Sequence, residues 1–277
     1  MEPVALPEDD AVLLAFAGIT DPPDPAEGLF RADSWIRKIH AEGVLVFGGG
    51  RALLLEVAHP LVAAGVARFS DFGSDPFGRL RRTLEALRTL TFAPCEAALE
   101  VARHVEQVHR HVRGTLSQGT RRFPSGTPYS GRDPESALWV WATLVDTSLV
   151  MYERFVAELD GAAREAYYAD QCILGRLLGV PAALVPPSYS EFRGYFEGVL
   201  GDGTLEVTAE GREIGRAVLA SSSEIDADDR LEAITAALLP ESLRAPFGLI
   251  WDDAREERFE SLVRSVRALR PEEGGLA

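Results

Sequence analysis

The sequence predicts an all-α fold, a single globular helical domain over residues 1–277, and three observations support it. Apolar residues recur at intervals of three and four along most of the chain, as they do on the buried face of a helix. Strand signals are scarce, since residues 44–47 form the only short β-like run. No internal repeat or convincing linker divides the chain, and the polar segment 271–277 is expected to be a flexible tail.

Helix starts in the first half are marked by capping residues and prolines. Asp33 can cap the first helix, and Asp75 followed by Pro76 is a cap with proline in the first turn. Pro60 and Pro94 each begin a further helix, because proline is tolerated at a helix start and disfavoured inside one. We expect helices over residues 33–44, 51–59, 60–69, 75–90 and 94–114.

The second half opens with residues 114–134, which are rich in Gly, Pro, Ser and Thr. This composition predicts a long loop, and such a loop is a candidate lid or entrance edge. Ser188 and Glu191 form an S-x-x-E capping box at the start of a later helix. The remaining helices are expected over residues 134–158 and 161–178, with three more segments within 208–270.

Charge and composition limit the partners of this chain. It has 28 Lys and Arg against 43 Asp and Glu, a formal charge of −15. No broad basic surface is then available to bind nucleic acid or an anionic membrane. Two cysteines, Cys95 and Cys172, exclude a disulfide framework and a thiolate metal cage.

The sequence also bears on location. The N-terminus, MEPVALPEDD, lacks the charged-then-apolar order of a signal peptide. The longest apolar run, residues 137–152, is short for a bilayer span of about 20 residues and carries Asp146 in its middle. We therefore expect a cytoplasmic protein without a membrane span.

A local positive island interrupts the acidic background. Arg79, Arg82 and Thr83 are spaced three or four residues apart, so they share one helix face. Guanidinium groups bind carboxylates bidentately, and the Thr83 hydroxyl can donate a hydrogen bond. This face suits an anionic cofactor, although a solvated basic face paired with surface glutamates has the same spacing. The island also contains Arg81 and Arg88.

Histidines on the following helix offer a metal ligand beside the island. His109 and His111 are two residues apart and point in different directions, and His104 shares the face of His111. Periodicity leaves all three open, since each can equally be a surface or core residue. His59 can either cap the break before Pro60 or face a cavity. A haem b (iron protoporphyrin IX) needs one axial imidazole, cationic partners for its carboxylates and an apolar slot, so it is the natural candidate for the cofactor, although none of these residues alone proves haem.

Three further positions join the candidates. Asp146 lies in an apolar helix, where it is either paired with a helix end or an arginine or serves as a site acid. Arg51 follows three glycines and is a cofactor-binding candidate, although these glycines lack the dinucleotide fingerprint and favour a tight helix entry. Trp141 belongs to the core by default and can also wall an apolar slot.

Five motifs, taken in order, carry a resemblance to a known family. They are VFGGGRALLLEVAHPLVAAGV, DPFGRLRRT, HRHVRGT, LWVWATLVDT and LPESLRAPFGL. Over about residues 33–265, with 1–32 as an N-terminal extension, the chain resembles the oxygenases that include the rubber oxygenase (latex clearing protein) and the MpaB-type oxygenase of mycophenolic acid biosynthesis.

The resemblance implies a helical domain with a globin-like core, a b-type haem, and dioxygen-dependent cleavage of carbon–carbon double bonds in isoprenoid chains. By position, Arg79 and Thr83 match the family's residues beside the haem, and His109 matches the proximal ligand, with His111 in reserve. Arg82 stands where the rubber enzyme has a lysine that can bind the distal side of the iron. Because arginine cannot deprotonate to bind iron, an open or water-occupied distal site is expected.

The same resemblance shapes the expected activity. His59 belongs to the family's His-Pro element and is assigned a pocket role, while Trp141 replaces a histidine of many relatives and predicts a more apolar pocket. We expect a haem b-dependent oxygenase that acts on a small hydrophobic alkene with dioxygen, with Arg82, Thr83, His59 and Asp146 as catalytic candidates. The alternative is a helical protein that binds a lipid-like metabolite or haem without turnover. Non-haem metal hydrolysis has less support, since no two-His-one-carboxylate set appears.

Overall fold

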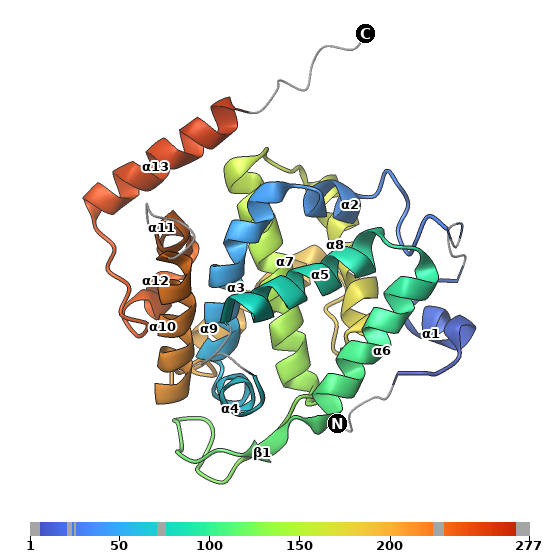
Figure 1. Ribbon diagram of the computed structural model, residues 1–277, viewed down its shortest axis with the longest axis horizontal. Helices are drawn as coiled ribbons and strands as arrows, with labels where there is room; N and C mark the ends of the chain where they lie inside the picture. The colour runs from blue at the N-terminus through green and yellow to red at the C-terminus, as the bar shows by residue number, and fades with distance from the viewer. Residues whose placement is uncertain (1–5, 21–23, 25, 71–75, 224–229, 270–277) are drawn as a thin grey trace.

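The computed structural model of the chain is almost entirely helical (Figure 1). Within the described residues the chain forms thirteen α-helices, one 3-10 helix and two short strands. The all-α prediction is therefore confirmed. The tail predicted at 271–277 lies outside the described residues, which are 6–20, 24, 26–70, 76–223 and 230–269.

Helix α7 (Pro134–Phe155) runs through the middle of the molecule (Figure 1). Its first turn is fixed by Pro134 and by the Asp133 carboxylate, which accepts a hydrogen bond from the backbone N–H of Ser136 at 2.8 Å. Because α7 is apolar on nearly every face, it is enclosed by other helices, and α3 (Gly49–Ala58) packs directly against it.

Helix α3 is buried from Gly50 to Ala58, in accordance with its nearly continuous apolar sequence. It ends at His59, and α4 (Pro60–Phe69) begins after a bend of 110°. The β-like run at 44–47 is not a strand, because it lies in the 3-10 helix η1 (Gly43–Gly48) that leads into α3. At Gly48 a Cβ would lie 2.8 Å from Met151, so only glycine allows η1 to approach α7 this closely.

Helices α5 (Pro76–Phe92) and α6 (Cys95–His111) follow each other as packed neighbours. The proposed cap of α5, Asp75, lies outside the described residues. Helix α6 ends at His111 and not at Gly114, because residues 113–115 form a strand.

That strand, β1 (Arg113–Thr115), pairs antiparallel with β2 (Pro128–Ser130). Gly114 lies opposite Tyr129, where a Cβ would come 2.6 Å from the tyrosine ring. The segment 114–134, predicted to be a long loop, therefore contains a short hairpin near its two ends and is otherwise without helix or strand before α7 begins at Pro134.

Helix α2 (Trp35–His40) starts at a different residue from the one predicted. Its N-cap is Ser34 and not Asp33. The backbone N–H of Ile36, in the first turn of α2, instead donates to the carboxylate of Asp170 on α8 (Gly161–Leu177) at 3.1 Å. Because Asp170 is distant in the sequence, residues near the start of α2 could not indicate this hydrogen bond.

The C-terminal half wraps α7 and α3 with further helices. Ser188 caps the first of them as predicted, since its hydroxyl accepts from the Glu191 N–H at 3.2 Å. Four helices follow residue 208 where three were expected, because Pro240 starts a short separate one. The remaining helices are α1 (Asp10–Phe16), α9 (Tyr189–Gly201), α10 (Ala209–Ser223), α11 (Arg230–Leu238), α12 (Glu241–Arg244) and α13 (Asp253–Ala268).

Among the helices described, none has by itself the length and apolar character needed to cross a membrane. The bent pair of residues 43–58 and 60–69 meets the length and composition criteria only when its two parts are taken together.

Candidate functional site

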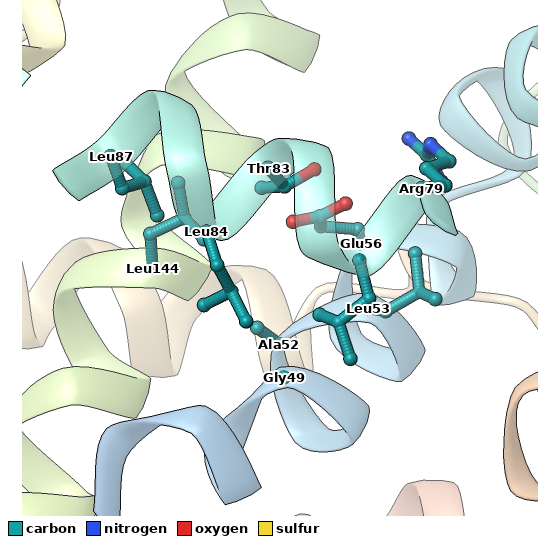
Figure 2. Close-up of a pocket in the computed structure, with 10 residues that line it drawn as sticks. Gly49, Ala52, Leu53, Glu56, Arg79, Thr83, Leu84, Leu87 and Leu144 are labelled. Carbon is teal, nitrogen blue, oxygen red and sulfur yellow. The ribbon is translucent and has the colours of Figure 1, made fainter. Parts of the chain in front are cut away.

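A small cavity lies between helices α3, α5 and α7 (Figure 2). Its volume is about 60 Å³, enough for roughly two waters at about 30 Å³ each. The polar side chains of Glu56, Arg79 and Thr83 gather at one end. The opposite end is lined by Leu84, Leu87 and Leu144.

Glu56 is the most perturbed acid of this cavity, and sequence reasoning missed it. The residue is only 9% exposed, on the buried helix α3. Burial raises the pKa of its carboxyl to about 7, and the positive charge of Arg79 opposes that rise. A lone acid inside the apolar run G-R-A-L-L-L-E-V-A-H-P was the available signal. A carboxyl with such a pKa can exchange a proton near neutral pH.

Of the three residues expected on one face of α5, two reach the cavity. Arg79 and Thr83 line it, and Thr83 is also exposed, so the threonine marks the cavity mouth. Burial lowers the pKa of Arg79, the Glu56 carboxylate raises it, and Arg82 lowers it. Arg82 is exposed and is not among the residues that line the cavity, although its charge lies close enough to lower the pKa of Arg79.

The three histidines of α6 differ clearly in their surroundings. His109 is half-buried, whereas His104 and His111 are exposed. The Nδ1 atom of His111 lies 2.8 Å from the carbonyl oxygen of Gln107, a local contact within the helix. Only His109 therefore has a partly enclosed imidazole on this helix.

The electrostatic environment of His109 favours the neutral form of its ring. Burial lowers the pKa of His109, the nearby Arg79 charge lowers it further, and Glu106 raises it. The charge of Arg79 thus acts on both Glu56 and His109, from helix α5, which packs against α6 and shares the cavity with α3. These three residues form the candidate site.

His59 lies elsewhere, at the elbow between α3 and α4. It is 5% exposed, and its ring packs against Phe123 with centroids 5.3 Å apart. Its buried Nδ1 has no hydrogen-bond partner among the described residues. Burial is the main reason that the pKa of His59 falls to about 4. The residue is not part of the lining of the cavity between α3, α5 and α7.

Asp146 and Arg51 are paired with each other in the core. The Asp146 carboxylate accepts hydrogen bonds from Arg51 Nη2 at 2.6 Å and from Arg193 on α9. Arg51 also donates to the Thr147 hydroxyl at 2.6 Å and to the carbonyl oxygen of Leu238 at 2.8 Å. Of the two alternatives for Asp146, the arginine partner is the one present. This network joins α3, α7, α9 and α11, and none of its members lines the cavity.

Trp141 faces the aromatic core between α7, α8 and α9. Its indole Nε1 donates to the carbonyl oxygen of Gln171 at 3.0 Å, and its ring packs against Tyr168 and Phe192. A Cβ at Gly175 would lie 2.9 Å from the indole, so α8 and α7 are in close contact here. The default interpretation of Trp141 as a core residue matches these contacts.

A second buried polar cluster was not anticipated. His40 contacts the Thr91 hydroxyl through Nδ1 at 2.9 Å and the Gln171 amide through Nε2 at 3.1 Å. Gln171 also donates to the Tyr167 hydroxyl at 2.6 Å. Burial lowers the pKa of His40 to about 4. The cluster ties the C-terminal end of α5 to α2 and α8, and so fixes the helix that carries Arg79.

The donor set at the candidate site has the chemistry that a haem requires. A neutral imidazole is the form that binds iron, and burial together with Arg79 favours that form of His109. The Arg79 guanidinium suits a haem carboxylate. Within the described ranges, no group of three or more His, Cys, Asp or Glu is placed to hold a metal ion. A haem site with one axial histidine needs no such group.

The fold and site together define a helical protein in which a buried acid on α3, a guanidinium on α5 and a half-buried imidazole on α6 share one electrostatic environment. The sequence also identifies the family. Residues 36–268 match the ER-bound oxygenase mpaB/B′ and rubber oxygenase catalytic domain, so the chain belongs to that family. The resemblance inferred from the five motifs is thereby confirmed, and the chain carries an oxygenase-family catalytic domain.

Two relatives extend the comparison. The uncharacterized proteins Mb2261 of Mycobacterium bovis and Rv2237 of Mycobacterium tuberculosis are each 31% identical to this chain over 225 residues. The alignment covers 78% of this chain and 84% of each relative. No solved structure gives a significant match.

Proposed function

We propose that the protein is a haem b-dependent oxygenase that acts with dioxygen on a small hydrophobic alkene, such as an isoprenoid. The observation that carries this proposal is the shared electrostatic environment of Glu56, Arg79 and His109. It combines an iron-binding imidazole, a carboxylate-binding guanidinium and a carboxyl that exchanges protons near pH 7, all in a member of an oxygenase family.

His109 is the proposed axial ligand, and Arg79 the proposed partner of a haem carboxylate. When bound, a ferrous haem would supply the binding and activation of dioxygen. The cavity of about 60 Å³ is too small for a macrocycle, since pockets for drug-sized ligands measure about 300–1,000 Å³. The cavity would therefore adjoin the cofactor and not contain it.

Glu56 is proposed as the acid–base group of the reaction. In the deprotonated form its carboxylate oxygen can take a proton from a small polar group or a water that enters the cavity, and in the protonated form it can return one. A pKa near 7 makes both forms available at neutral pH. The Thr83 hydroxyl at the cavity mouth can donate a hydrogen bond to a polar oxygen atom there.

Arg82 receives a smaller role than the sequence implied. Its exposed side chain is better suited to the entrance than to contact with dioxygen. Asp146, Arg51 and Trp141 are assigned to stability, because their polar atoms are engaged in the core. His59 is likewise placed outside the proposed reaction site.

An absorption spectrum of the purified full-length chain tests this function. We expect a Soret band in the oxidised protein, a shift of that band on reduction under carbon monoxide, and dioxygen uptake in the presence of an isoprenoid alkene. A protein that stays colourless after haemin is added would contradict the proposal. It would favour the alternative, a helical binder of a lipid-like metabolite.

A further inference from the structure

The last turn of α6, which carries His109, contacts the segment that leads from the hairpin to α7. Strand β1 begins two residues after α6 ends, and β2 returns beside it (Figure 1). Gly131 follows β2, and its backbone N–H donates to the Val112 carbonyl oxygen at 2.8 Å. The Val112 N–H in turn donates to the His109 carbonyl oxygen at 3.1 Å. Two backbone hydrogen bonds therefore connect Gly131 to the backbone of His109.

The contact leaves no space for a side chain at Gly131. A Cβ there would lie 2.7 Å from the His109 carbonyl oxygen, 2.9 Å from Val112 Cβ and 3.2 Å from His109 Cα. Gly131 does not adopt a positive φ, so the requirement for glycine comes from packing and not from backbone conformation. Because the nearest neighbour is a backbone atom, no side-chain rotation could relieve the contact. An added methyl group would have to separate the two backbone segments.

The segment around Gly131 is anchored on both sides. Asp133 caps α7, and its own N–H donates to the Ser130 carbonyl oxygen at 3.0 Å. The Arg132 guanidinium forms an ion pair with Glu106 of α6, with Nε 3.3 Å from a carboxylate oxygen. Because this pair joins the segment to the last turns of α6, the segment cannot withdraw without disturbing that helix.

We propose that Gly131 is a positioning residue that sets where the His109 imidazole lies relative to the iron. This inference rests on the proposed function, in which His109 binds a haem. A binding group must be held to within about 0.5 Å, and loss of the contacts that orient a metal-binding histidine weakens metal binding by about 10–100-fold. To bring the 2.7 Å contact to an ordinary separation of 3.4 Å, the backbone would have to move by about 0.7 Å, which exceeds this tolerance.

The haemin affinity of Gly131→Ala tests the proposal, with Gly119→Ala as the matched control. A Cβ at Gly119 would lie 2.8 Å from the Ser125 backbone nitrogen, so the same substitution creates a similar backbone contact within the hairpin loop. We expect the dissociation constant for haemin to rise by about tenfold or more in Gly131→Ala and to stay unchanged in Gly119→Ala. Thermal unfolding verifies that each variant is folded. Wild-type affinity in folded Gly131→Ala would overturn the proposal.

Free imidazole separates the positioning of His109 from a general distortion of the site. In His109→Gly, imidazole from solution can replace the missing ring without a link to the α6 backbone. In that background Gly131→Ala should cause no further loss of haemin affinity, because the ligand is no longer tied to the displaced backbone. A loss as large as in the chain that retains His109 would show that Gly131 only shapes the pocket, contrary to the proposal.

A second pair of variants serves if Gly131→Ala does not fold. Arg132→Gln removes the ion pair with Glu106, whereas Arg122→Gln removes an ion pair of 2.9 Å with Asp202, away from α6. Haem loss should be several-fold faster in Arg132→Gln than in Arg122→Gln. Equal rates in these two variants would contradict a positioning role for the segment.

The ring signals of His109 in the cofactor-free protein distinguish a failure of this inference from a failure of the proposed function. By NMR, these signals should be displaced in Gly131→Ala and unchanged in Gly119→Ala, and those of the exposed His104 should be unchanged in both. If the purified protein binds no haem, the proposed function fails, while displaced His109 signals still support the positioning role. His109 signals that do not move in Gly131→Ala would refute that role whether or not haem binds.

Discussion

Arg79 and Glu56 line one cavity from facing helices, and the guanidinium opposes the burial that brings the Glu56 pKa to about 7. Neither effect depends on a bound cofactor. The pair therefore sets the protonation state of the candidate site in the cofactor-free protein. This state can be measured before any activity is known.

Glu56→Gln should change the pH dependence of stability. The folded-state pKa of Glu56 lies above its ordinary value of 4.5, so between about 4.5 and 7 the folded state binds more protons than the unfolded state. The contribution of Glu56 to stability is then complete below pH 4.5 and is lost as the pH rises through 7. At about 1.4 kcal/mol per pKa unit, this loss is on the order of 3 kcal/mol.

Urea unfolding of the wild type and of Glu56→Gln, from pH 4 to pH 8, measures this difference. The variant should be the more stable protein above pH 7, and the advantage should disappear below pH 4.5. Glu85→Gln on the exposed face of α5 is the matched control and should show no such trend. Parallel curves for wild type and Glu56→Gln would mean that Glu56 does not titrate near 7.

Arg79→Ala should act on both neighbours of the guanidinium. Without its charge the pKa of Glu56 should rise further and the pKa of His109 should also rise, because Arg79 now lowers both. Haem affinity should fall by about tenfold or more, because the haem carboxylate would lose one charge-assisted hydrogen-bond partner, which contributes about 1.5–3 kcal/mol.

Haem titration, with infrared observation of the protonated carboxyl, measures both effects of Arg79→Ala. Arg81→Ala is the control, because Arg81 is exposed and pairs with Glu85 at 3.0 Å on the same helix. Equal haem affinity in the two variants would remove Arg79 from the cofactor site.

Asp146→Asn should destabilise the protein by about 3–5 kcal/mol, since it leaves the buried Arg51 guanidinium without its carboxylate. The double variant Arg51→Met/Asp146→Leu should recover part of this loss, because it removes both charges together. Urea denaturation gives the values. If Asp146→Asn instead kept wild-type stability and lost only turnover, Asp146 would be a site acid after all.

The helices could be predicted from the sequence where neighbouring residues determine where a helix begins. Pro60 and Ser188 begin helices where their chemistry predicts, and the apolar sequence of α7 matches its burial. Predictions failed where a residue distant in the sequence determines the local structure. The Asp170 carboxylate accepts the hydrogen bond of a backbone N–H at the start of α2, so the prediction that Asp33 caps this helix was wrong. Gly114 pairs with Tyr129 in a hairpin that the loop-like composition did not indicate.

In the candidate site, too, the sequence predicted what depends on local spacing and missed what depends on packing. Spacing could place Arg79 and Thr83 on one face, but it could not tell that Arg82 lies outside the cavity. It left the histidines of α6 unresolved, because burial by neighbouring helices distinguishes His109 from His111. Glu56 was missed since its significance comes from the helices packed around it and not from its own sequence neighbours.

The central claim, that the His109 imidazole binds a haem iron, is tested most directly by the Soret absorbance of haemin-reconstituted variants. We predict that His109→Ala loses the ferric Soret band and the carbon monoxide-shifted ferrous band, whereas His111→Ala, which changes an exposed imidazole two residues away, keeps both. A full, unshifted haem spectrum in folded His109→Ala would contradict the account.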